Sequence, residues 1–108
     1  MKIIYNNIIP FKGFVAMNLF GTIFARKKYK PLSERTINHE AIHTAQMKEL
    51  LYVFFYIIYA LEWPLHFFQP KGAYRNISFE KEAYGNDKNL EYLKTRKRFA
   101  WCKYFKLK

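Results

Sequence analysis

The sequence predicts an α+β fold in which a short N-terminal antiparallel β-hairpin or meander packs on about three helices. The first thirty residues are rich in Ile, Val and Phe and are interrupted by glycine and proline, which is typical of short strands. The rest of the chain holds two stretches with helical spacing and a charge-free apolar run between them. The 108 residues, 1–108, suffice for one domain with one core, so an active site would share residues with that core.

The β region, residues 1–30, is expected to contain two or three strands. Pro10, Gly13 and Gly21 interrupt its apolar residues and mark turns between the strands. Within residues 15–19, larger apolar side chains alternate with smaller or polar ones, as they do in a strand with one buried face. An amphipathic helix over the same stretch is the alternative.

A helix is expected from about Glu34 to Gln46. Ser33 or Thr36 can serve as its N-cap, because a hydroxyl oxygen accepts a hydrogen bond from a backbone N–H of the first turn. The stretch has no glycine or proline, consists of good helix formers and repeats its apolar residues at steps of four.

The most hydrophobic stretch of the chain completes the region 34–69. Residues 50–61 carry no charge and would surround a helix with apolar side chains on every side. The run is shorter than the roughly 20 residues that span a bilayer, so a buried core helix or a re-entrant segment is expected, although counting on to Phe68 reaches spanning length. Pro64 should kink or end this helix near Trp63.

A third helix is expected within residues 74–96. Asn76 or Ser78 can cap it, and Gly85 weakens its middle. Beyond it, residues 97–108 alternate basic and aromatic side chains, which predicts a docked final helix or an arm at a membrane interface.

Composition narrows the choice of partners and compartment. The formal net charge of +11 favours anionic partners such as phospholipid headgroups or nucleic acid. An aromatic content of 20% predicts an exposed apolar surface, which a membrane or a second copy of the chain can cover. The single cysteine, Cys102, excludes an internal disulfide and a cysteine-based zinc cluster and favours a reducing compartment. No standard secretory signal opens the sequence, so we expect a cytoplasmic protein, peripheral at the inner face of the membrane.

The strongest chemical signal is the HExxH motif, His39-Glu40-Ala41-Ile42-His43. Its two histidines lie one helical turn apart on one face, so both can bind a single metal ion. Glu40 is rotated by about 100° from His39, which places its carboxylate beside the metal, within reach of a metal-bound water that it can deprotonate. Three His and seven Glu placed at random would give this motif about 0.004 times, so chance explains it poorly. A degenerate site that only stabilises the fold is the structural alternative.

A zinc site of this kind needs a third protein ligand and one open position for water. The sequence offers three candidates further along the chain, which are His66, Glu80 and Glu82. Helical geometry favours only one of the two glutamates facing inward.

The sequence here resembles the gluzincin metallopeptidases, over about residues 36–89. In that family a second helix bears a glutamate ligand, often in a Glu-x-x-Ala pattern, and residues 80–83 (Glu-Lys-Glu-Ala) match it. The resemblance implies that His39, His43 and Glu80 hold Zn2+ and that Glu40 is the general base. The whole chain also resembles a group of small uncharacterised bacterial proteins that share the run HEAIHTAQ, an aromatic helix and an AYRNISFE segment, and this likeness implies no substrate.

Supporting residues are harder to assign. The family often has an acid four residues beyond the glutamate ligand, where this sequence has Tyr84. Asp87 can compensate because it shares a helical face with Glu80, and a solvated acidic stripe is the alternative. An oxyanion would need a further donor, for which the candidates are Tyr74, Tyr84, Tyr5 and His66. The N-terminal strands either hold substrate as an added strand, as in gluzincin-like enzymes, or have the purely structural role that we favour.

These patterns predict a zinc-dependent metallopeptidase, a hydrolase that cleaves a peptide or protein substrate through a zinc-bound water activated by Glu40. The alternative is a non-catalytic, metal-stabilised module that binds a membrane surface or a protein partner through its apolar helix and basic tail. The basic residues near the C-terminus are Lys94, Arg96, Lys97, Arg98, Lys103, Lys106 and Lys108. Nucleic-acid binding is a weaker third interpretation.

Overall fold

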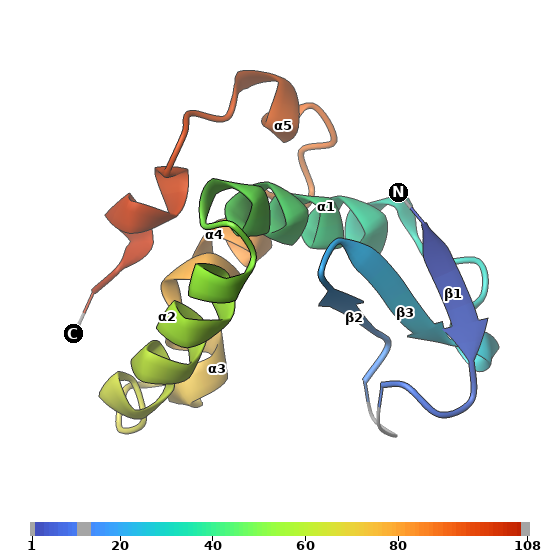
Figure 1. The fold of residues 1–108 in the computed structure, drawn as a ribbon, viewed down its shortest axis with the longest axis horizontal. Helices are drawn as coiled ribbons and strands as arrows, with labels where there is room; N and C mark the ends of the chain where they lie inside the picture. The colour runs from blue at the N-terminus through green and yellow to red at the C-terminus, as the bar shows by residue number, and fades with distance from the viewer. Residues whose placement is uncertain (1, 11–13, 107–108) are drawn as a thin grey trace.

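The fold is α+β, as predicted, in a computed structural model that describes residues 2–10 and 14–106. A three-stranded sheet with the order β1-β3-β2 forms the N-terminal part (Figure 1). Its strands are β1 (Ile3–Asn6), β2 (Ala16–Leu19) and β3 (Thr22–Arg26). Gly13 and Lys108, which entered the sequence predictions, lie outside the described residues.

The predicted antiparallel hairpin is confirmed in β2 and β3. Phe20 and Gly21 form its turn with φ of 52° and 92°, a left-handed conformation that glycine adopts without strain. A meander is excluded, because β1 pairs with β3 in parallel instead of forming a second hairpin. This pairing leaves β2 at one edge of the sheet.

Helix α1 (Glu34–Glu49) begins where the sequence predicts and ends three residues later than Gln46. Its N-cap is Ser33, whose Oγ accepts a hydrogen bond from the backbone N–H of Thr36 at 3.1 Å. A short 3₁₀ turn, η1 (Lys27–Tyr29), connects β3 to it. In Figure 1 α1 lies between the sheet and the remaining helices, so its two sides face different parts of the molecule.

Helix α2 (Val53–Leu65) contains most of the charge-free run. It starts late because Leu51 and Tyr52 have φ of 53° and 62°, which no α-helix accepts, and Pro64 lies in its last turn. The expected buried core helix is buried on one side only, at Phe55 and Glu62, and much of its outer side is exposed. Within the described residues, no helix combines the length and the hydrophobicity needed to cross a membrane.

The single helix expected within residues 74–96 is wrong, because the structure divides this stretch into three helices: α3 (Gly72–Asn76), α4 (Ser78–Asn86) and α5 (Tyr92–Thr95). Ile77 is extended and separates the first two, and α4 ends one residue after Gly85. Neither predicted cap is used: α4 has no cap from its own N-cap side chain, and Glu62 of α2 instead accepts from the Ser78 N–H at 2.8 Å.

The C-terminal segment folds back on the helices as the short 3₁₀ turn η2 (Ala100–Tyr104). Trp101 packs on the core cluster of Met47, Phe55, Ile77 and Phe79, with its ring centroid 4.8 Å from that of Phe79. The expected docked ending is therefore present as a single 3₁₀ turn. A second cluster, formed by Ile23, Ala25 and Leu32, fills the space beside the sheet.

Candidate metal centre

Three side chains from α1 and α4 converge in the interior of the molecule. The Nε2 atoms of His39 and His43 lie 3.3 Å and 3.1 Å from the same carboxylate oxygen, Oε1 of Glu80. One ligand atom from each of the three residues lies within 4.8 Å of the others, and all three side chains are buried. The histidines meet because they are one turn apart on α1, and Glu80 joins them because α4 packs against that face.

The other ring nitrogen of each histidine, Nδ1, is hydrogen bonded to a side chain outside this centre. Asp87 Oδ2 lies 2.9 Å from Nδ1 of His39, and Gln46 Oε1 lies 2.8 Å from Nδ1 of His43. Each oxygen can accept only from an Nδ1–H, which leaves the Nε2 lone pairs directed at the space beside Glu80. Metal-binding histidines are commonly oriented in this way.

Electrostatics make the cluster suited to a cation. Burial raises the pKa of the Glu80 carboxyl, but the neighbouring His43 and His39 outweigh it and hold that pKa well below its usual range. Burial also disfavours a charged His43, but the attraction of Glu80 raises the pKa of His43 to about 9. Because protons and metal ions compete for Nε2, binding a metal would release a proton from His43.

Glu40 lies beside the cluster without joining it. Burial raises the pKa of its carboxyl, opposed by the nearby His43 and His39. No described residue donates a hydrogen bond to its carboxylate, although only 8% of the residue is exposed. Glu40 lines two clefts, so a ligand or water can reach its carboxylate.

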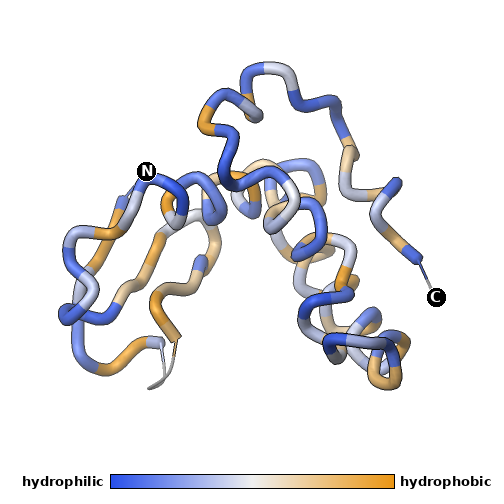
Figure 2. Tube along the Cα trace, turned by 180° about the vertical axis from the view of Figure 1, so that it is seen from behind, coloured by the Kyte–Doolittle hydropathy of each residue, from blue (hydrophilic) through white to orange (hydrophobic). Residues whose placement is uncertain are grey.

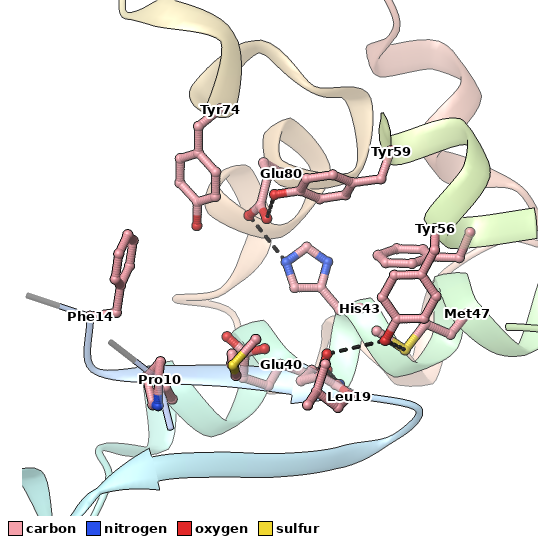
Figure 3. A pocket seen from close by; sticks show the side chains of 14 residues that line it. Pro10, Phe14, Leu19, Glu40, His43, Met47, Tyr56, Tyr59, Tyr74 and Glu80 are labelled. Carbon is pink, nitrogen blue, oxygen red and sulfur yellow. Dashed lines mark hydrogen bonds and ion pairs between the residues drawn. The ribbon is translucent and has the colours of Figure 1, made fainter. Parts of the chain in front are cut away.

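That space is a cleft of about 340 Å³ that reaches the cluster. Its lining includes Glu80 with Tyr59 and Tyr74 beside it, and Glu40 lies across from them, with His43 in between (Figure 3). The edge strand lines the opposite side with residues 16–19. A second, more polar cleft shares Glu40 and Tyr74 with the first, and its lining also includes Arg35, His39, Tyr84 and Asp87.

The structure brings some of the predicted supporting residues to the centre. The ring of Tyr84 contacts the His39 ring edge-on, with centroids 4.5 Å apart, and its hydroxyl lies 3.0 Å from that of Tyr74. Asp87 contacts His39 as described, so the acidic-stripe alternative does not apply to it. Tyr74 lines both clefts and is the tyrosine candidate for an oxyanion donor that lies nearest the open space.

Other candidates lie elsewhere. Both ring nitrogens of His66 are bonded to other side chains, Nε2 to Glu62 at 3.0 Å and Nδ1 to Gln69 at 2.7 Å, so it is neither third ligand nor oxyanion donor. Glu82 faces away from the histidines and pairs with Arg96. The hydroxyl of Tyr5 accepts from the backbone N–H of Leu32 beside the sheet.

Three residues of the centre were missed by sequence reasoning. Tyr59 donates from its hydroxyl to Oε2 of Glu80 at 2.8 Å, which leaves Oε1 for the histidines. Gln46 donates from Nε2 to the carbonyl of Phe79, tying α1 to α4. Asn18 of β2 donates to the Glu40 carbonyl at 2.9 Å and fixes the edge strand beside the motif. Of these three, only Gln46 could have been found from the sequence, because a residue three positions after His43 on the same helix lies next to it.

The donor set could hold a metal ion. Two imidazole nitrogens and one carboxylate oxygen form a three-ligand set with an open side toward the cleft, as in catalytic zinc sites. Calcium and magnesium favour oxygen ligands alone, so the two imidazoles point to a transition metal or zinc. The residues present therefore fit the ion that the sequence predicts. Comparison of the chain with protein-family models, curated proteins and solved structures found no match in any of the three.

Proposed function

We propose that this chain is a zinc-dependent hydrolase of peptide or amide bonds. The observation that carries the proposal is that the His39, His43 and Glu80 cluster borders a cleft that Glu40 also lines. A structural zinc site is closed by four protein ligands, whereas this group offers three and opens onto a cleft.

In this proposal His39, His43 and Glu80 hold the metal, and Asp87 and Gln46 keep the two imidazoles in the required tautomer. A zinc ion supplies Lewis-acid polarisation of the substrate carbonyl and lowers the pKa of water. Glu40 takes a proton from the attacking water and returns it to the leaving amine.

The edge strand supports a peptide substrate. The Arg26 N–H donates to the Val15 carbonyl at 3.2 Å, and hydrogen-bonded pairs alternate along antiparallel strands. The backbone groups of Ala16 and Asn18 therefore point away from β3. The Asn18 carbonyl accepts from Tyr56, which leaves Ala16 able to pair with an extended peptide beside the cleft. Substrate binding by this strand thus gains support over the purely structural role.

Metal content tests the ligand assignment. Protein purified without a metal-affinity tag should carry about one zinc ion per chain by elemental mass spectrometry. His39→Ala and Glu80→Ala should lose it, whereas Glu91→Ala, which changes an exposed acid, should keep it. Circular dichroism should first show each variant to be folded. Absence of zinc together with no uptake on titration would overturn the assignment.

Activity tests the role of Glu40. Glu40→Gln should retain zinc but lower the cleavage rate of a peptide library by about 10²- to 10⁴-fold. Glu91→Gln is the matched control and should cleave like the wild type. Equal cleavage by the Glu40→Gln variant would refute the mechanism even if zinc is bound.

A further inference from the structure

The outer side of α2 carries a ridge of exposed apolar side chains, which we call the α2 ridge. It consists of Phe54, Ile57, Leu61, Leu65 and Phe68. At about 100° per residue the first four fall within an arc of about 80° on the helix surface. Their exposed fractions lie between 47% and 63%, and Phe68 in the turn that follows is 95% exposed. Figure 2 shows the hydrophobic colour at the far end of α2.

The opposite side of the same helix attaches it to the molecule. Phe55 stacks on Phe79 with ring centroids 4.5 Å apart, and the buried Glu62 accepts hydrogen bonds from Ser78. α2 is therefore held by one face, and the α2 ridge is a convex apolar surface, not a groove. Such contiguous apolar surface usually marks an interaction site.

The charge on the molecular surface is almost entirely positive. Five of the eight acidic side chains are buried, and a sixth, Glu49, is paired with the Arg96 guanidinium. Only Glu34 and Glu91 are exposed, and Glu91 is paired with Lys94. Most of the Lys and Arg side chains that the structure describes are exposed.

Exposed lysines flank the α2 ridge in the sequence. Lys48 precedes the helix and Lys71 follows it. The C-terminal segment brings Lys106 to the same end, because Gln69 donates to the Lys106 carbonyl at 3.1 Å. A row of large apolar residues between lysines is the pattern of helices that lie in the membrane interface.

We propose that the α2 ridge docks this protein on an anionic phospholipid bilayer, with α2 lying along the surface and its apolar side chains among the upper acyl chains. A second copy of the chain is a poor match, because it offers the lysines no exposed acidic cluster. Docking requires neither Glu40 nor a metal.

Vesicle flotation tests the docking. The full chain should float with vesicles of phosphatidylcholine and phosphatidylglycerol, and about tenfold less with phosphatidylcholine alone. Leu61→Ser with Phe68→Ser should lower the partition coefficient at least about tenfold, since two large apolar side chains are lost from the interface. Leu90→Ser with Leu93→Ser removes two exposed apolar residues near α5 and should leave flotation unchanged. Lys71→Gln should lower the partition coefficient about fivefold.

Each alternative occupant gives a different result. No flotation of the wild type, or equal flotation of wild type and Leu61→Ser/Phe68→Ser, would overturn the proposal. Dimerisation in sedimentation that the ridge variant abolishes, without vesicle binding, would assign the ridge to a second copy. Binding of RNA without vesicle binding would assign the basic surface to nucleic acid. Equal flotation of Glu40→Gln and wild type is expected, which separates docking from hydrolysis.

Discussion

Replacing Asp87 by Asn should weaken zinc binding while leaving all three proposed ligands in place. The carboxylate accepts from Nδ1 of His39 at 2.9 Å, and its side chain is only 4% exposed, so solvent screens this contact weakly. Asn keeps an acceptor in the same position and removes the charge. Loss of such a partner typically costs 10- to 100-fold in metal affinity, or about 1.4–2.7 kcal/mol.

Arg35→Gln is the matched control for this change. Arg35 Nε donates to the other oxygen of Asp87 at 2.8 Å, and about half of the Arg35 side chain is exposed. Removing this cation leaves the carboxylate and its contact with His39 in place, so zinc affinity should stay within about threefold of wild type or rise. Competition with a chromogenic chelator at neutral pH measures both dissociation constants. Wild-type affinity in folded Asp87→Asn would refute the orienting role, and equal losses in both variants would indicate displacement of the segment after α4.

Three further predictions concern residues that are not proposed metal ligands. Glu62→Ala should lower the free energy of unfolding by about 3 kcal/mol or more in urea titrations, because buried donors of Ser78 and His66 lose their acceptor. Arg96→Leu should cost about 3–5 kcal/mol in the same assay, since it leaves the carboxylates of the buried Glu82 and the half-buried Glu49 without their cation. Cys102 should react with iodoacetamide more slowly at pH 8 than a cysteine in a short peptide, because burial and nearby glutamates raise its pKa and reduce its thiolate fraction; an equal rate would contradict this.

Local spacing made the motif residues of the metal centre predictable. His39, Glu40 and His43 belong to one helix, so their relative positions follow from helical geometry alone. The Ser33 cap and the hairpin of β2 and β3 were predictable for the same reason, as each depends on a few adjacent residues. Glu80 was selected through a resemblance, and spacing alone left Glu82 open.

The remaining contacts depend on how distant segments pack. Tyr59 reaches Glu80 only because α2 lies against α4, and no periodicity within either helix encodes that contact. The helix expected within residues 74–96 fails for a related reason. Its composition favours a helix, but an extended Ile77 lets its side chain fill the core and turns Ser78 toward Glu62. Tertiary packing here overrides local propensity.

Helix α2 contributes to both the proposed metal site and the proposed membrane-docking surface. Its inner side fixes Glu80 twice, through the Tyr59 hydroxyl on the carboxylate and through Glu62 at the start of α4. Its outer side carries the α2 ridge. The position of the third ligand is therefore set by the same helix that meets the bilayer in our proposal, and a displacement of α2 would move Glu80 relative to the two histidines of α1. Because the cluster tolerates little movement at 3.1–3.3 Å separations, the placement of α2 determines whether the three ligand atoms remain together.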